Sequence, residues 1–256
     1  MGRKGGPSNQ KRLTMGTNKR YLIVNADDFG RSFGVNRGII EAHEKGIVTS
    51  ASLMVRWPAA AAAAAYAKER PSLGLGLHLD LGEWAYKEGA WTAVYEVVPT
   101  DDHTAVAEEA AHQLATFRRL LGRDPTHIDS HQHIHRWEPA RSILIGIARG
   151  LAVPLRHHSA GVRYCGDFHG QTARGVPLPK AISVDGLIEM LIGLPPGATE
   201  LACHPGLDDE LESTYRSERA EEVKVLCDPR VQAAIPRGIE LCSFDSEALC
   251  GLDLVP

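Results

Sequence analysis

The sequence predicts an α/β fold, with a complete or imperfect (β/α) barrel as the first choice and an open doubly wound sheet as the second. Short apolar segments alternate about seven times with longer segments of helical periodicity. This alternation is typical of βαβ units, which build parallel sheets through right-handed crossovers. A chain of 256 residues with 43% hydrophobic content is long enough to bury the core of such a domain.

The chain divides at about residue 20. The first twenty residues are basic and rich in glycine and hold almost nothing to bury, so we expect a disordered tail there. Residues 21–256 are expected to form a single barrel domain.

The expected elements follow in order from Tyr21. Each expected strand is bounded by Gly, Pro, Asp or Asn. The strands are 21–26, 47–55, 73–81, 126–134, 151–157, 199–204 and 239–244. The expected helices are 35–46, 58–71, 103–122, 138–150, 184–194 and 214–226. Residues 82–100 fit neither pattern, and their four aromatic side chains indicate a long aromatic loop.

Composition excludes several function classes. With 28 Lys and Arg against 32 Asp and Glu, the net charge is −4, so no broad basic surface is expected for nucleic acid or for a membrane. We expect no secretion signal, because no apolar segment follows the basic start, and no apolar run of about 18 residues is present. Five scattered cysteines argue against a disulfide framework. We expect a cytoplasmic protein that acts on a small molecule, and self-association stays open.

In barrels the chemistry lies at the carboxyl ends of the strands, so polar residues there are the candidates. The first strand ends in Asn25, Asp27 and Asp28. One carboxylate can hold a metal while its neighbour works as a base, and a simple turn cap is the alternative. His78 alternates with leucines on the third strand, and His204 ends the strand before a Pro-Gly turn.

The segment HIDSHQHIH, residues 127–135, places four histidines and Asp129 at every second position. If this segment were extended, its ends would lie roughly 26 Å apart, so one ion with bonds near 2 Å could not gather all five side chains. The middle of the segment is the favoured ligand position. We therefore expect His131 at a metal, with Asp129 or His133 close by.

The motifs NADDFG, GIIEAHEKGIVTSASLMV, LGLHLDL, THIDSHQHIH and ACHPG, in this order, resemble the YdjC-like carbohydrate deacetylases, which include chitooligosaccharide deacetylase. The resemblance implies a barrel that removes acetyl groups from N-acetylated amino sugars at a divalent metal. Its implied metal ligands are Asp28, His78 and His131. It implies Asp27 as the general base and His204 as the general acid. Residues 82–100 and 159–183 show no match to the family pattern, so the sugar is not determined.

The implied chemistry is consistent with the residues. Mixed oxygen and nitrogen ligands favour Zn²⁺, although the resemblance also suggests Mg²⁺. Weaker candidates for substrate contact are Asp129, His133, Arg156 and Trp84, the last as a flat surface for a sugar ring. Two other classes stay open: a metal hydrolase of the amidohydrolase type that acts on another amide, and a non-catalytic sugar-binding barrel.

Overall fold

The structure is a computed structural model that describes residues 19–207, 215–235 and 238–256. The expected disordered tail therefore lies outside the described residues, except for its last two positions. The first strand already begins at Arg20, one residue before the expected start of the domain.

The main sheet has seven strands, all paired in parallel, in the order β6-β3-β2-β1-β8-β7, with β9 also paired to β1. β9 pairs with the start of β1, and β2 pairs with the end of β1. Within the described ranges no ladder joins β6 to β7, so the barrel is open. The predicted α/β fold with an imperfect barrel is confirmed. The strands are β1 (Arg20–Phe29), β2 (Ser50–Leu53), β3 (Gly74–Leu79), β6 (Ile128–Ser130), β7 (Val162–Cys165), β8 (Gly197–Cys203) and β9 (Ile239–Leu241).

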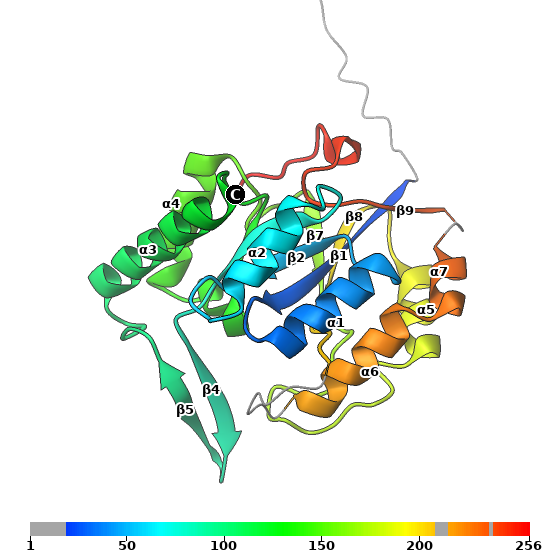
Figure 1. The fold of residues 1–256 in the computed structure, drawn as a ribbon, viewed down its shortest axis with the longest axis horizontal. Coiled ribbons are helices and arrows are strands. Elements are labelled where there is room, and N and C mark those ends of the chain that lie inside the picture. The colour runs from blue at the N-terminus through cyan, green and yellow to red at the C-terminus, as the bar shows by residue number, and fades with distance from the viewer. Residues whose placement is uncertain (1–18, 208–214, 236–237) are drawn as a thin grey trace, which may run out of the picture.

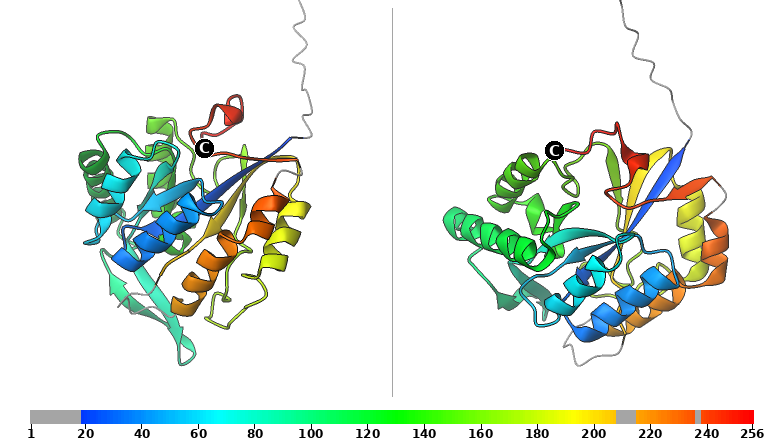
Figure 2. Two further views of the ribbon diagram at one scale, coloured as in Figure 1. Left: turned by 45° about the vertical axis from the view of Figure 1, so that its right-hand side comes forward. Right: turned by 45° about the horizontal axis from the view of Figure 1, so that its top comes forward.

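The helices cover the outer side of this curved sheet, in an arc that Figures 1 and 2 show from α4 and α3 through α2 and α1 to α6, α5 and α7. All six expected helices are present, and the short α7 was not predicted. The helices are α1 (Phe33–Glu44), α2 (Ala60–Lys68), α3 (His103–Leu121), α4 (Ala140–Leu151), α5 (Val184–Gly193), α6 (Arg216–Leu226) and α7 (Pro229–Ala234). The described residues also form two 3₁₀ helices, η1 (His131–Arg136) and η2 (Glu247–Leu249).

The two faces of the sheet differ in chemistry because side chains alternate along each strand. Leu22, Val24 and Leu75 point outward and belong to the hydrophobic core beneath the helices. Asn25 and Ser52 point inward, where they are hydrogen-bonded to buried acids. Toward the carboxyl ends of the strands the inner face is therefore a polar network, whereas Ile23, nearer the amino end of β1, belongs to a small apolar cluster.

Residues 126–134 do not form one strand, contrary to expectation. β6 ends at Ser130, and the chain turns into η1 because Gln132 (φ 50°) and His133 (φ 55°) both adopt the left-handed conformation. The 26 Å separation estimated for an extended chain therefore does not apply. The turn separates His131 from the later histidines of the segment.

Residues 82–100 are not the expected loop either. They form a hairpin of β4 (Gly82–Lys87) and β5 (Ala90–Glu96), which projects from the body in Figure 1. Glu88 and Gly89 both have positive φ, as a two-residue turn of type I′ requires. The expected strand 151–157 is also absent and is represented only by a single bridge between Ile128 and Leu155.

Candidate metal centre and active-site cavity

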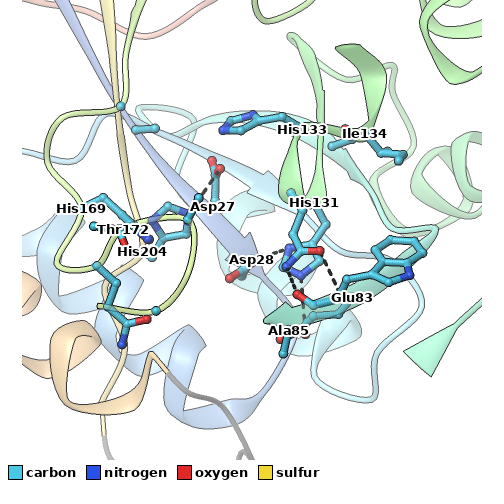
Figure 3. Close-up of a pocket in the computed structure, with 18 of the residues that line it drawn as sticks. Asp27, Asp28, Glu83, Ala85, His131, His133, Ile134, His169, Thr172 and His204 are labelled. Carbon is cyan, nitrogen blue, oxygen red and sulfur yellow. Dashed lines mark hydrogen bonds and ion pairs between the residues drawn. The ribbon is translucent and has the colours of Figure 1, made fainter. Parts of the chain in front are cut away.

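A cavity of about 730 Å³ opens at the carboxyl ends of the strands. Its walls include all five residues to which the resemblance assigned a role: Asp27, Asp28, His78, His131 and His204. These residues come from β1, β3, η1 and the loop after β8, and Figure 3 labels four of them. The fold thus brings together side chains that are far apart in the sequence.

Three of these side chains converge on one point. Asp28 Oδ1 lies 3.4 Å from His78 Nε2 and 3.2 Å from His131 Nδ1. Ligands held tetrahedrally at 2.0–2.1 Å from one ion are about 3.3 Å apart, so these separations fit a shared cation. Asp28 Oδ1 and His78 Nε2 are also buried without a hydrogen-bond partner. Because unpaired buried polar atoms are costly, this geometry fits a metal site.

Asp129 orients one of the imidazoles. Its Oδ1 accepts a hydrogen bond of 2.7 Å from His78 Nδ1, which leaves Nε2 facing Asp28. A carboxylate behind a histidine ligand commonly fixes the tautomer in this way. Burial alone would lower the pKa of His78, but Asp129, together with Asp28 and Asp27, outweighs it and the pKa rises to about 10. A field that stabilises an imidazolium here also favours a metal cation.

Asp28 is held in place by backbone and charge. It has a φ of 68°, and the pairing of β1 with β2 is irregular between Ala26 and Phe29. Consecutive residues of a regular strand point to opposite faces, whereas this bulge lets both Asp27 and Asp28 reach the cavity. Burial would raise the pKa of Asp28, but Arg219 of α6, which bonds its Oδ2, and His131 hold it well below the usual range.

Asp27 is held by a buried arginine. Arg156 donates hydrogen bonds of 2.7 Å to both Asp27 oxygens and also pairs with Asp129 and Glu200. Burial raises the pKa of Asp27, and Arg156 more than offsets this, so that the pKa is lowered. Asp27 is therefore ionised and fixed in orientation, with lone pairs still available to a proton donor.

Asp129 and Arg156, two of the expected substrate contacts, belong to this buried network. Asp129 is fully buried and Arg156 is 4% exposed, and neither belongs to the cavity wall. They lie behind it, where they orient His78 and Asp27. This geometry does not support direct contact between substrate and either residue.

His204 lies next to Asp27, and its Nε2 is 3.7 Å from Asp27 Oδ2. Its backbone N–H donates to Glu222 of α6. Burial lowers the pKa of its imidazole to about 3. The following turn packs tightly on α1, since a Cβ on Gly38 would meet Gly206 Cα at 2.4 Å. The absence of a side chain at Gly38 thus permits a close contact that positions this loop.

The structure adds residues that the sequence analysis did not select. Glu83, at the base of the hairpin, pairs with Arg31, and its Oε2 lies 3.5 Å from His131 Nε2. Arg219 bonds Asp28, and His169 stacks on Tyr215 beside His204. The one feature of the sequence that could have indicated Glu83 as a site residue is its position just after the expected third strand. Nothing in the sequence indicated that Arg219 would reach Asp28.

The hairpin supplies one wall of the cavity. Trp84, Tyr86 and Trp91 line it, and Gln132 fixes Trp84 through two hydrogen bonds with its backbone. Trp91 is 55% exposed, so part of this aromatic surface is free. His133 also lines the cavity. The placement of Trp84 and His133 is compatible with the expected substrate contacts.

Comparison with known proteins agrees with the motifs. A family model described as YdjC-like protein matches residues 21–237. A carbohydrate deacetylase of Geobacillus stearothermophilus is 34% identical, over 88% of this chain and 97% of its own length. A chitooligosaccharide deacetylase of Salmonella schwarzengrund (strain CVM19633) is 30% identical, over 88% of this chain and 98% of its own. These matches confirm the resemblance inferred from the sequence.

Solved structures are similar as well. A protein of Enterococcus faecalis V583, described as a "putative cellobiose-phosphate cleavage protein", has a TM-score of 0.73 and 27% identity, over 90% of this chain and 98% of that one. A peptidoglycan N-acetylglucosamine deacetylase shares the fold, with a TM-score of 0.56, 13% identity and coverage of 89% and 88%. Separately, none of the helices in the described ranges combines the length and apolar character that a membrane span needs.

Proposed function

Because the chain belongs to the YdjC-like protein family, we propose that it is a metal-dependent hydrolase that removes the acetyl group from an N-acetylated amino sugar. Its relatives include proteins named carbohydrate deacetylase and chitooligosaccharide deacetylase, which act on amide bonds. The observation that carries the proposal is the convergence of Asp28, His78 and His131 beside Asp27 and His204 in one cavity.

Asp28, His78 and His131 would hold the ion. A divalent metal bound there would polarise the acetamide carbonyl and lower the pKa of a water molecule. One carboxylate and two imidazoles suit Zn²⁺, whereas Mg²⁺ prefers more oxygen ligands. We therefore propose zinc as the resident ion.

The remaining steps belong to the protein. Asp27, kept ionised by Arg156, accepts the proton of the attacking water. Burial keeps His204 neutral in the resting site, so it must first receive a proton, and Asp27, 3.7 Å away, is the source. His204 then passes this proton to the departing nitrogen, so that acetate and a free amine leave. The shared network means that Arg156 orients the base and, through Asp129, influences the metal ligand His78.

The substrate class follows from the relatives and the cavity wall. Trp84, Tyr86 and Trp91 offer apolar ring faces of the kind on which sugars stack, next to the polar centre. We propose a chitooligosaccharide or another glycoconjugate that contains N-acetylglucosamine. The names of the relatives favour this activity over hydrolysis of another amide and over sugar binding without catalysis.

The test combines metal analysis with acetate release from a panel of acetamido sugars. Wild-type protein should lose activity on chelation and regain it with Zn²⁺. Asp27→Asn should keep the ion and lose about 10²–10⁴-fold in turnover, because proton transfer is removed while the ligands stay. His131→Ala should lose both ion and turnover. His112→Ala, an exposed histidine on α3, is the matched control. A fully active Asp27→Asn would refute the assignment of the base.

A further inference from the structure

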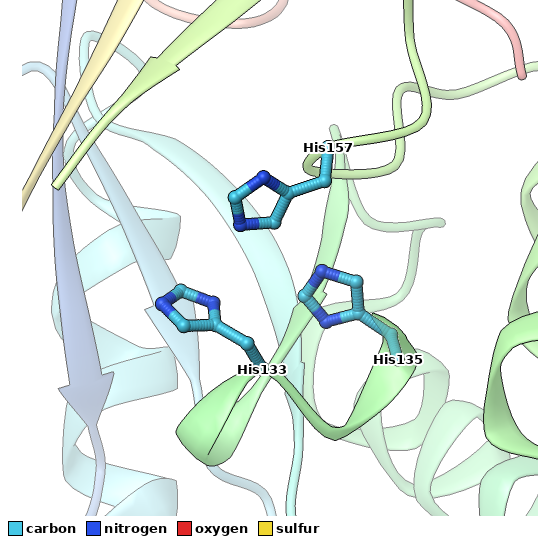
Figure 4. A group of neighbouring side chains, drawn as sticks. All are labelled: His133, His135 and His157. Carbon is cyan, nitrogen blue, oxygen red and sulfur yellow. The ribbon is translucent and has the colours of Figure 1, made fainter. Parts of the chain in front are cut away.

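We propose that His133, His135 and His157 form a second metal-binding site, for a borderline divalent ion such as Zn²⁺, distinct from the Asp28, His78 and His131 centre. Figure 4 shows the three imidazoles gathered around a common space. His133 and His135 come from η1, and His157 comes from the segment after α4. The left-handed turn at Gln132 and His133 separates this group from His131.

The geometry matches what three imidazoles need to share an ion. Each ring offers a nitrogen within 4.8 Å of a nitrogen on both other rings. The ring centroids are 5.1, 5.6 and 5.8 Å apart. A metal–nitrogen bond of 2.0–2.1 Å puts each centroid about 3.2 Å from the ion and places tetrahedral neighbours about 5.2 Å apart. Small rotations of the rings would bring the nitrogens to bonding distance.

Hydrogen bonds to hydroxyl groups orient two of the three imidazoles. His135 is fully buried, and its Nδ1 is 2.6 Å from Ser130 Oγ, while its Nε2 is buried without any hydrogen-bond partner. His133 shows the same pattern, with Nε2 3.1 Å from the Tyr164 hydroxyl and Nδ1 buried and unpartnered. His133 and His135 thus each have one nitrogen held by a hydroxyl and one left to bind. This is how ligand histidines are commonly oriented.

Charge and donor type select the ion. Arg156 lies near the cluster, with its guanidinium 5.2 Å from the Tyr164 ring, and by itself would repel a cation. Asp27, Asp129 and Glu200 surround this guanidinium and offset part of its charge. Nitrogen ligands without carboxylate favour Zn²⁺, Co²⁺, Ni²⁺ or Cu²⁺ over Mg²⁺ and Ca²⁺.

The site has access to solvent. His133, His157 and Tyr164 line a second cavity, and His133 also lines the main one. An ion held by three histidines keeps a fourth position for water or another ligand. The second ion would therefore be bound at the border of the substrate cavity, reachable from outside through the exposed His157.

The experiment is a titration of the metal-free full-length protein with Co²⁺, followed by visible absorption and by equilibrium dialysis. Wild type should bind two equivalents. His157→Ala should bind one, because this exposed ligand can be removed without disturbing the core. Its matched control, His112→Ala, is an exposed histidine outside every cluster of potential ligands in the described ranges and should bind two. Ser130→Ala should weaken one equivalent about 10–100-fold through loss of the His135 contact.

His131→Ala separates the two sites. If both exist, this variant binds one equivalent and the double variant with His157→Ala binds none. Two equivalents in His157→Ala, or a single wild-type equivalent that His131→Ala abolishes, would overturn the second site and leave the proposed function intact. A single wild-type equivalent that only His157→Ala abolishes would instead support the second site and refute the catalytic metal centre.

Discussion

Asp129→Asn tests whether the network behind the cavity controls the metal centre. The substitution keeps the size of the side chain but removes its charge. In the wild-type protein Asp129 accepts from His78 Nδ1 at 2.7 Å, Ser52 Oγ at 2.6 Å and Arg156 at 2.7 Å. The substitution replaces one accepting oxygen by an amide NH₂ group, which would face these donors. The amide cannot satisfy all three donors, so His78 loses its fixed orientation and part of its basicity.

The expected magnitude follows from the loss of a carboxylate behind a histidine ligand. Such losses typically weaken metal binding about 10–100-fold, which corresponds to about 1.4–2.8 kcal/mol. The assay is competition for Zn²⁺ with a chromogenic chelator, performed well below the unfolding temperature of each variant. Turnover at saturating metal is measured in parallel, so that a loss of affinity is distinguished from a loss of catalysis.

Asp80→Asn is the matched control. Asp80 is equally buried and lies two residues after His78, but it is hydrogen-bonded to Arg56, Trp57 and Tyr95. This substitution should lower stability and leave Zn²⁺ affinity unchanged. If Asp129→Asn bound Zn²⁺ within twofold of wild type, or if Asp80→Asn weakened binding equally, the assigned role of Asp129 would be wrong.

Two further predictions concern the inner face of the sheet. Gly76→Ala should lower the free energy of unfolding by about 1–3 kcal/mol in urea titrations, because its Cβ would lie 2.5 Å from the His127 ring. Gly146→Ala is the control and should not destabilise the protein, because the space around Gly146 on α4 is open. Equal stability of the two variants would contradict the prediction. His127 is buried and stacked on Phe244, and burial lowers the pKa of its imidazole from 6.5 to about 4. As the pH falls, the imidazole is therefore protonated in the unfolded chain before it is protonated in the folded one. The free energy of unfolding decreases as the pH falls from 6.5 toward 4, by about 2 kcal/mol at pH 5. His127→Asn should show a correspondingly weaker pH dependence of unfolding between pH 7 and 5, and an unchanged dependence would rule out His127 as the source.

Some features of the site were predictable because they depend on strand ends alone. Asp28 and His78 lie at the ends of β1 and β3, and His204 follows β8. Parallel strands bring their carboxyl ends to one edge. The same rule placed His131 near the cavity even though the expected strand was wrong. Sequence reasoning therefore placed these side chains at one edge of a complete or imperfect barrel, and the family resemblance supplied the ligand set.

Other features depend on the left-handed backbone. Periodicity assumes a regular strand, so it could not predict that Asp28 at φ 68° would join Asp27 in the cavity. It equally missed the turn at Gln132 and His133, which directs the later histidines toward His157. Alternation in HIDSHQHIH suggested one shared face, whereas the chain places His131 in one cluster, His133 and His135 in another, and His127 in neither.

The sequence by itself determined the fold class and the donor groups at the strand ends, because hydrophobic periodicity and strand order are local and topological properties. Only the tertiary structure decided which charges surround those groups. Arg156 next to Asp27, Arg219 next to Asp28 and Glu83 near His131 are contacts between distant segments. Such contacts depend on how helices and the hairpin pack around the sheet, and the strength of a buried charge interaction is set by that three-dimensional environment.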